Sequence, residues 1–199
     1  MRRALPLMIA RARSIRGTLG SPVSLFACAI LSSAVLLAHP AEAAETCPVQ
    51  VAYSPDGSAE ELVVSAISGA RQSIRLAAYS FTSPSVVRAL MAAKQRGVDV
   101  AVVVVDEKAN HGKASVAALN ILTQAGIRSR TVSIYPIHHD KYIMIDGAQI
   151  ETGSFNYSSA ARRNSENAVL ISQCPAVARS YLQHWQSRWS QGSDYVLPY

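Results

Sequence analysis

The spacing of hydrophobic and polar positions changes repeatedly between residues 49 and 191. Short apolar or alternating runs, typical of strands, occupy 49–53, 73–81, 98–105, 127–133 and 166–171. Segments with the apolar spacing or the start and stop signals of helices lie between and after them, at 58–70, 83–96, 113–124, 158–162 and 175–191. This alternation predicts an α/β fold in which a mixed β-sheet is sandwiched between helices.

The segment 138–156 has the pattern of a β-hairpin. Asp146-Gly147 favours a two-residue turn, because these residue types tolerate the positive φ that the turn needs. Such a turn would pair Lys141 with Thr152 and His139 with Ser154, on one face of the hairpin. The Asn156 amide would follow one step further on. An imidazole, an ammonium, hydroxyls and an amide on one patch could bind a phosphate and attack it.

Each of these residues alone also has an ordinary structural explanation. A single histidine on a strand is usually structural, a single lysine is usually a solvated charge, and a hairpin turn favours Asp146 without any chemistry. In the predicted register Asp146 points to the other face and is structural. The combination favours chemistry, because His139 and Lys141 would both face inward among isoleucines, where an unpaired lysine is costly.

His139-x-Lys141, Asp146 and Gly153-Ser154-x-Asn156 resemble the HKD motif of the phospholipase D superfamily. From about residue 49 onward the chain is similar to the small bacterial Nuc-type endonucleases, for example at 53–57, 78–82 and 164–169. The resemblance implies a phospholipase D-like fold and a phosphodiesterase that forms a phosphohistidine and needs no metal or other cofactor. It implies catalytic roles for His139, Lys141, Asp146, Ser154, Asn156 and Glu166, with Glu166 orienting the nucleophilic ring.

The chemistry needs two imidazoles, one to attack phosphorus and one to protonate the leaving oxygen. The chain holds one complete motif, so the resemblance implies a homodimer with the active site at the two-fold interface. His138 is the rival second histidine, although neighbouring strand residues point to opposite faces. His111-Gly112-Lys113 also reads His-x-Lys, but Ala118 stands where the motif requires aspartate.

Three functions from different classes remain open. A non-specific endonuclease acting on DNA or RNA is favoured by the similarity along the chain. A phospholipase D would use the same chemistry, but we expect no exposed apolar loop or basic amphipathic helix that would dock on a membrane. A non-catalytic phosphate-binding module fits poorly with a complete set of histidine, lysine and asparagine. A basic rim would support phosphate binding, although its members could be ordinary solvated charges: Lys108, His111, Lys113, Arg162 and Arg163.

Residues 1–43 have the pattern of a secretory signal. Five arginines precede an apolar run at 25–38, and Ala41-Glu42-Ala43 is a small-x-small cleavage site. We therefore expect a single domain at 44–199 in the periplasm or outside the cell, with an uncleaved anchor as the alternative. Without the signal, 14 basic and 12 acidic residues leave a charge of +2 in place of +6, so overall charge gives no argument for nucleic acid.

Two cysteines, Cys47 and Cys174, remain in the expected mature domain, one near each end. An even pair in an oxidising compartment often forms a disulfide, and two free thiols are the alternative. No cluster of cysteine and histidine has the spacing of a zinc site.

Overall fold

A computed structural model describes residues 46–105 and 110–197. In this part of the chain one mixed sheet of eight strands has the order β1-β7-β6-β5-β2-β3-β4-β8, in which only the neighbouring pairs β2–β3 and β3–β4 are parallel. The strands are β1 (Val49–Ser54), β2 (Ser73–Ala78), β3 (Asp99–Val105), β4 (Arg128–Val132), β5 (Tyr142–Ile145), β6 (Gln149–Gly153), β7 (Glu166–Ile171) and β8 (Ser193–Asp194). The helices are α1 (Ser58–Gly69), α2 (Pro84–Gln95), α4 (Lys113–Gln124), α5 (Pro175–Gln191) and a 3-10 turn, η1 (Ala161–Arg163).

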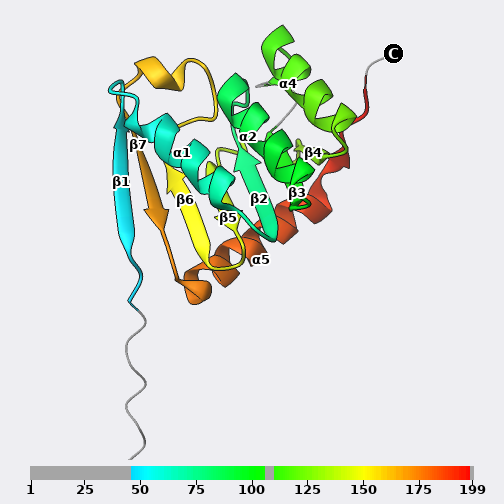
Figure 1. The fold of residues 1–199 in the computed structure, drawn as a ribbon. Helices are drawn as coiled ribbons and strands as arrows, with labels where there is room; N and C mark the ends of the chain where they lie inside the picture. Colours follow the sequence, from blue (N-terminus) through cyan, green and yellow to red (C-terminus); the bar gives the residue numbers. More distant parts are fainter. Residues whose placement is uncertain (1–45, 106–109, 198–199) are drawn as a thin grey trace, which may run out of the picture. The chain divides into compact units, whose positions relative to one another are not determined.

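Helices cover the sheet on both faces, which confirms the predicted fold class. α1, α2 and α4 pack on one face, and α5 runs across the other (Figure 1). The larger core lies under the three helices and includes Ile74, Leu90 and Ile143. Under α5, Trp185 is buried and donates a hydrogen bond from Nε1 to the carbonyl of Leu76 on β2, 3.0 Å away.

Local sequence chemistry explains some helix boundaries and not others. The short helix expected at 158–162 is a 3-10 turn that begins only at Ala161. α2 begins as predicted, because the Ser83 side chain accepts a hydrogen bond from Val86 N and Pro84 is the first helical residue. A serine at the start of a helical pattern, here Ser58, predicts the N-cap of α1, and this prediction is wrong. Gly57 occupies that position with φ +95°, and the Ser58 hydroxyl donates instead to the Tyr53 carbonyl, 3.0 Å away.

The predicted register of the central hairpin is wrong by one residue. Asp146 and Gly147 have positive φ as expected, and Ala148 N donates a hydrogen bond to Ile145 O. However, Ile145 pairs with Gln149 and Tyr142 pairs with Thr152, so the connection is a three-residue turn, 146–148, in place of the predicted two-residue turn. The Ala148 carbonyl accepts a hydrogen bond from Cys174 N at 2.8 Å, which explains why Ala148 is diverted from β5.

The predicted strand also begins too early. β5 starts at Tyr142, and residues 133–141 have no regular secondary structure. No backbone-to-backbone hydrogen bond holds residues 134–140 within the described part of the chain. His139 and Lys141 therefore lie on a loop that leads into the sheet, and the expected opposition of His139 and Ser154 across a ladder does not occur.

Cys47 and Cys174 form a disulfide, which decides between the two alternatives left open by the sequence. The bridge joins the segment before β1 to the residue before α5. The expected signal at 1–43 and the rim residue Lys108 lie outside the described residues. Within residues 46–105 and 110–197, none of the helices has both the length and the apolarity required to cross a bilayer.

Candidate active site

The motif residues meet at one edge of the sheet. Tyr142 at the start of β5 pairs with Ala77 near the end of β2 and with Thr152 near the end of β6. Antiparallel pairing therefore brings the segment before β5 next to the segments that follow β2 and β6. β7 also begins at this edge, because Gly153 pairs with Ala168.

His139 and Lys141 are in direct contact. The Lys141 ammonium lies 3.2 Å from His139 Nε2 and donates a hydrogen bond to the His139 carbonyl at 3.0 Å. An ammonium has only donors, so this contact requires a lone pair on Nε2 and places the ring proton on Nδ1. His139 is exposed, whereas Lys141 is 8% exposed. Burial lowers the pKa of Lys141, and the charges of Glu166 and Asp140 oppose this effect.

Tyr79 is a member of the site that sequence reasoning missed. Its ring lies 4.6 Å from the His139 ring and 5.3 Å from Lys141 Nζ, a cation–π distance. The buried Asn110 side chain donates to the Tyr79 carbonyl at 3.0 Å and accepts from Phe81 N at 3.1 Å. The sequence did offer a signal, since Tyr79 lies in the segment 78–82 that resembles the Nuc-type endonucleases.

The segment after β6 is held against β7. Ser154 Oγ accepts a hydrogen bond from Asn167 N at 3.0 Å, and Ser154 N donates to Asn167 O at 3.1 Å. Gly153 is required for this approach, because a Cβ there would lie 2.2 Å from Asn167 O. The amide oxygen of Asn156 is buried and has no hydrogen-bond partner among the described residues. That atom is therefore not committed to a structural contact.

Asp146 lies at the far end of β5 from His139. Its carboxylate accepts backbone hydrogen bonds of 2.8 to 2.9 Å from Arg71, Gln72 and Ser73, which connect α1 to β2. These contacts fit the structural role that the hairpin pattern predicts. A catalytic role implied by the motif finds no support in this geometry.

Glu166 is near the pair but does not contact His139 through a hydrogen bond. Its Oε1 accepts from Asn164 Nδ2 at 3.0 Å. Glu166 acts on Lys141 electrostatically, since its charge raises the pKa of that ammonium against the effect of burial. The role of orienting the His139 ring stays a prediction.

The described residues of the expected basic rim are exposed, and their role in binding phosphate stays a prediction. Arg162 forms an ion pair with Glu60 at 3.0 Å, and Arg163 donates to the Ser159 carbonyl at 3.4 Å. Both arginines, His111 and Lys113 are exposed, with Lys113 at the first position of α4. No metal cluster of three or more histidine, cysteine, aspartate or glutamate residues occurs in the described ranges.

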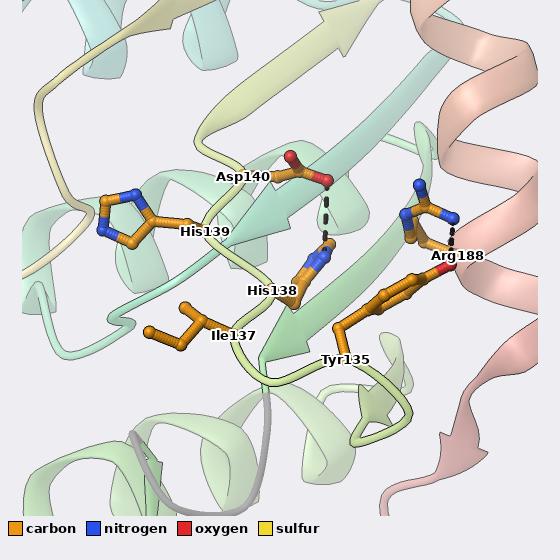
Figure 2. A pocket seen from close by; sticks show the side chains of 6 residues that line it. All are labelled: Tyr135, Ile137, His138, His139, Asp140 and Arg188. Atoms are coloured by element: carbon orange, nitrogen blue, oxygen red, sulfur yellow. Dashed lines mark hydrogen bonds and ion pairs between the residues drawn. The ribbon is translucent and has the colours of Figure 1, made fainter.

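A shallow pocket of about 110 Å³ lies beside His139, between the loop and α5 (Figure 2). His138 and Asp140 line it, and Figure 2 shows His139 pointing away from both of them. Ile134 and Ile137 on the same loop are 59% and 60% exposed. The expectation that no apolar loop is exposed is therefore wrong, since the loop that carries His139 presents two isoleucines.

One further ionisable pair is buried behind the site. Glu151 on β6 pairs with Ile143, and its carboxyl accepts a hydrogen bond of 2.6 Å from the Tyr157 hydroxyl. Burial raises the pKa of Glu151 to about 8, although the Tyr157 hydrogen bond lowers it. The Tyr157 carbonyl accepts from Thr82 N and Ser83 N, so this residue joins the Asn156 segment to the start of α2.

Comparisons with known proteins show the family of this chain. A family model described as "Cardiolipin synthase, PLD-like domain" matches residues 63–189. The chain belongs to the phospholipase D superfamily. It is 34% identical to a phospholipase D of Rickettsia bellii, over 70% of this chain and 68% of that protein. It is 30% identical to the human mitochondrial cardiolipin hydrolase, over 94% of this chain and 74% of that protein.

Solved structures extend the similarity to the fold. Nuc from Salmonella typhimurium, a phospholipase D family member, is 56% identical and superposes with a TM-score of 0.74, covering 75% of this chain and 99% of Nuc. NucT from Helicobacter pylori superposes with a TM-score of 0.67 at 21% identity, which shows the fold alone. Both the superfamily and the Nuc-type similarity expected from the sequence are confirmed, and the chain is a phosphodiesterase of this superfamily.

Proposed function

We propose that this phosphodiesterase is a secreted, metal-independent endonuclease that cleaves DNA or RNA through a phosphohistidine on His139. The contact between His139 and Lys141 carries the proposal. It presents the Nε2 lone pair of an exposed histidine, 3.2 Å from a buried ammonium. At this separation His139 can attack phosphorus while Lys141 neutralises the charge of the phosphate. In other phosphodiesterases a metal ion neutralises this charge and activates the nucleophile.

The proposed reaction has two displacements. In the first, His139 Nε2 attacks phosphorus, a P–N bond forms and the bond to the leaving oxygen breaks, while a second imidazole donates a proton to that oxygen. In the second, the same imidazole takes a proton from water, which attacks phosphorus and releases His139. Lys141 and the Asn156 amide stabilise the phosphoryl oxygens as their charge changes, and Ser154 adds a hydrogen bond.

A homodimer would supply the second imidazole from the partner subunit's copy of the same motif. Two observations support this part of the proposal. His138 is unsuited to the task, because its Nδ1 faces Asp140 at 3.3 Å and its Nε2 is buried. Ile134 and Ile137 offer exposed apolar surface on the loop that carries His139, where a second copy would approach.

Nucleic acid is favoured as the substrate by the similarity to Nuc over nearly all of that chain. The exposed cations Lys113 and Arg163 would contact neighbouring phosphates. A phospholipase D activity is the second candidate, and a specific observation favours it. Ile134 and Ile137 could enter a lipid surface beside His139, and the relatives include proteins named phospholipase D and cardiolipin hydrolase.

A substrate panel in EDTA tests the proposal. Plasmid DNA, single-stranded DNA, RNA and phosphatidylcholine vesicles would be incubated with the purified mature domain. We expect cleavage of nucleic acid with rates that fall as salt rises. Turnover of phosphatidylcholine alone would select the second candidate, and complete, reversible loss of activity in EDTA would refute the metal-free mechanism.

Two variants test the roles of the central pair. His139→Ala should abolish turnover, because the covalent path begins at this residue. Lys141→Ala should lower kcat by about 10²–10³-fold, as the loss of one donor to a developing oxyanion does. Lys94→Ala, at the C-terminal end of α2, is the matched control for loss of a lysine. A folded His139→Ala protein with more than a few per cent of wild-type activity would contradict the assignment.

The oligomeric state needs its own test. Sedimentation equilibrium of the wild type should show a dimer at assay concentration. His139→Ala subunits would also be mixed with Lys141→Ala subunits under exchange conditions. The resulting heterodimers should not regain full activity, because each site would need both copies of His139. A fully active monomer would refute the shared site.

A further inference from the structure

The loop that carries His139 is held by side chains. Residues 134–140 lack backbone-to-backbone hydrogen bonds within the described part of the chain. The two neighbours of His139 in sequence, His138 and Asp140, approach each other on the side of the loop away from the His139 ring (Figure 2). His138 is 3% exposed, so this side of the loop is packed against the body of the domain.

The Asp140 carboxylate joins this loop to α5. Asp140 Oδ2 lies 2.7 Å from His184 Nε2 on α5 and 3.3 Å from His138 Nδ1. A carboxylate only accepts hydrogen bonds, so His184 presents an N–H to Asp140 Oδ2. The same oxygen lies within ion-pair distance of His138, so one carboxylate oxygen lies between two rings. The His184 anchor is itself fixed, because the next residue, Trp185, is buried and bonds to β2.

The bridge has a consequence for the catalytic pair. In extended backbone, successive side chains point to opposite sides. Holding the Asp140 side chain against α5 therefore directs its neighbours His139 and Lys141 to the other side, where they meet at 3.2 Å. Tyr135, earlier on the same loop, is also joined to α5 through Arg188 and Gln191. The bond between Asp140 and His184 is the described link to α5 that lies next to His139 in sequence, so without it the nucleophile could turn away from Lys141.

We propose that Asp140 and His184 are positioning residues, which fix the attack geometry of His139 by bridging its loop to α5. This inference rests on the proposed role of His139 as the nucleophile. It does not depend on whether the natural substrate is nucleic acid or lipid. Neither residue contacts the phosphate, and both act through the orientation of the loop.

The bridge can be broken and restored at His184, which is 44 residues away from Asp140 in sequence. His184→Leu removes the donor. His184→Gln retains an N–H donor at a similar distance from the backbone, so it can re-form the bond to Asp140. Gln183→Leu adds the same leucine to an exposed neighbouring position of α5 and is the matched control.

Kinetics on bis(p-nitrophenyl) phosphate, a small phosphodiester, would measure the effect. His184→Leu should lower kcat by about 10- to 100-fold with KM changed less than about two-fold, because a misplaced nucleophile slows the chemical step. His184→Gln should recover most of the loss, and Gln183→Leu should match the wild type. Thermal unfolding of all variants would show that they are folded.

If the wild type is active, two results would overturn the positioning role of Asp140 and His184 without affecting the proposed role of His139. One is wild-type kcat in His184→Leu. The other is a loss in His184→Leu that His184→Gln repeats in full, which would assign His184 a role other than donating to Asp140. If the wild type itself fails to turn over the diester, the proposed function of His139 is refuted, and the inference is refuted with it.

Discussion

The buried carboxyl of Glu151 should make the stability of this domain depend on pH. Glu151 is 1% exposed, and burial raises its pKa from 4.5 to about 8. The folded protein therefore keeps the carboxyl protonated at pH values where the unfolded chain ionises it. For this group, stability is fully present below the unfolded pKa of 4.5, falls as pH rises toward 8, and is constant above that value.

The perturbation is Glu151→Gln, which keeps the size of the side chain and an oxygen that can accept from the Tyr157 hydroxyl. It removes ionisation in both states. A shift of 3.5 units corresponds to about 5 kcal/mol in total, of which about 1 kcal/mol is lost by pH 5 and about 3 kcal/mol by pH 7. The stability of the variant relative to wild type should thus grow by about 2 kcal/mol between these pH values.

Denaturant unfolding followed by tryptophan fluorescence would measure this, because Trp185 is buried and stacks on Trp189. Comparing the change between pH 5 and pH 7 cancels any constant difference between glutamine and neutral glutamate. Glu61→Gln, at an exposed position in the first turn of α1, controls for loss of a carboxylate. Parallel stability curves for wild type and Glu151→Gln over this range would refute the reasoning.

Two other substitutions test backbone roles within the motif. Gly153→Ala should destabilise the fold by about 3 kcal/mol, because the new Cβ meets the Asn167 carbonyl, whereas Gly69→Ala, which meets nothing within 4 Å, should not; equal unfolding midpoints for the two variants would contradict this. Asp146→Asn keeps a residue suited to the left-handed turn but removes the charge that accepts three backbone hydrogen bonds, and should lower the free energy of unfolding by about 2 kcal/mol. Lost turnover at unchanged stability would point instead to a chemical role for Asp146.

Local sequence signals were sufficient for most of the fold. The helices α4 and α5 and the strand β7 occupy the predicted residues, because apolar spacing and the helix start and stop signals act within a few positions. The hairpin register could not be predicted in the same way. The positive φ values at Asp146 and Gly147 occur as expected, but the turn also includes Ala148, whose carbonyl accepts a hydrogen bond from Cys174, a residue distant in sequence.

The candidate site shows the same division. The contact between His139 and Lys141 was predictable from the motif, since the two residues are adjacent on one side of an extended segment. The partners that surround them were not. Tyr79 follows another strand, and His184 reaches Asp140 only because α5 crosses the opposite face of the sheet. Such contacts depend on how distant strands and helices are arranged in space. Local patterns in a single sequence do not show this arrangement.

The hydrogen bonds of Asp146 indicate that the motif contains residues that hold the fold as well as residues that carry out the chemistry. Asp146 binds three backbone amides of another segment, and Gly153 leaves room for a neighbouring strand. Both would be needed by a duplicated gene copy that had lost its enzymatic activity and kept its fold. We therefore expect inactive copies of this domain to retain the aspartate and the glycine while His139 and Lys141 diverge. A recognisable motif remnant would then mark common ancestry, and only the histidine and lysine would mark an enzyme.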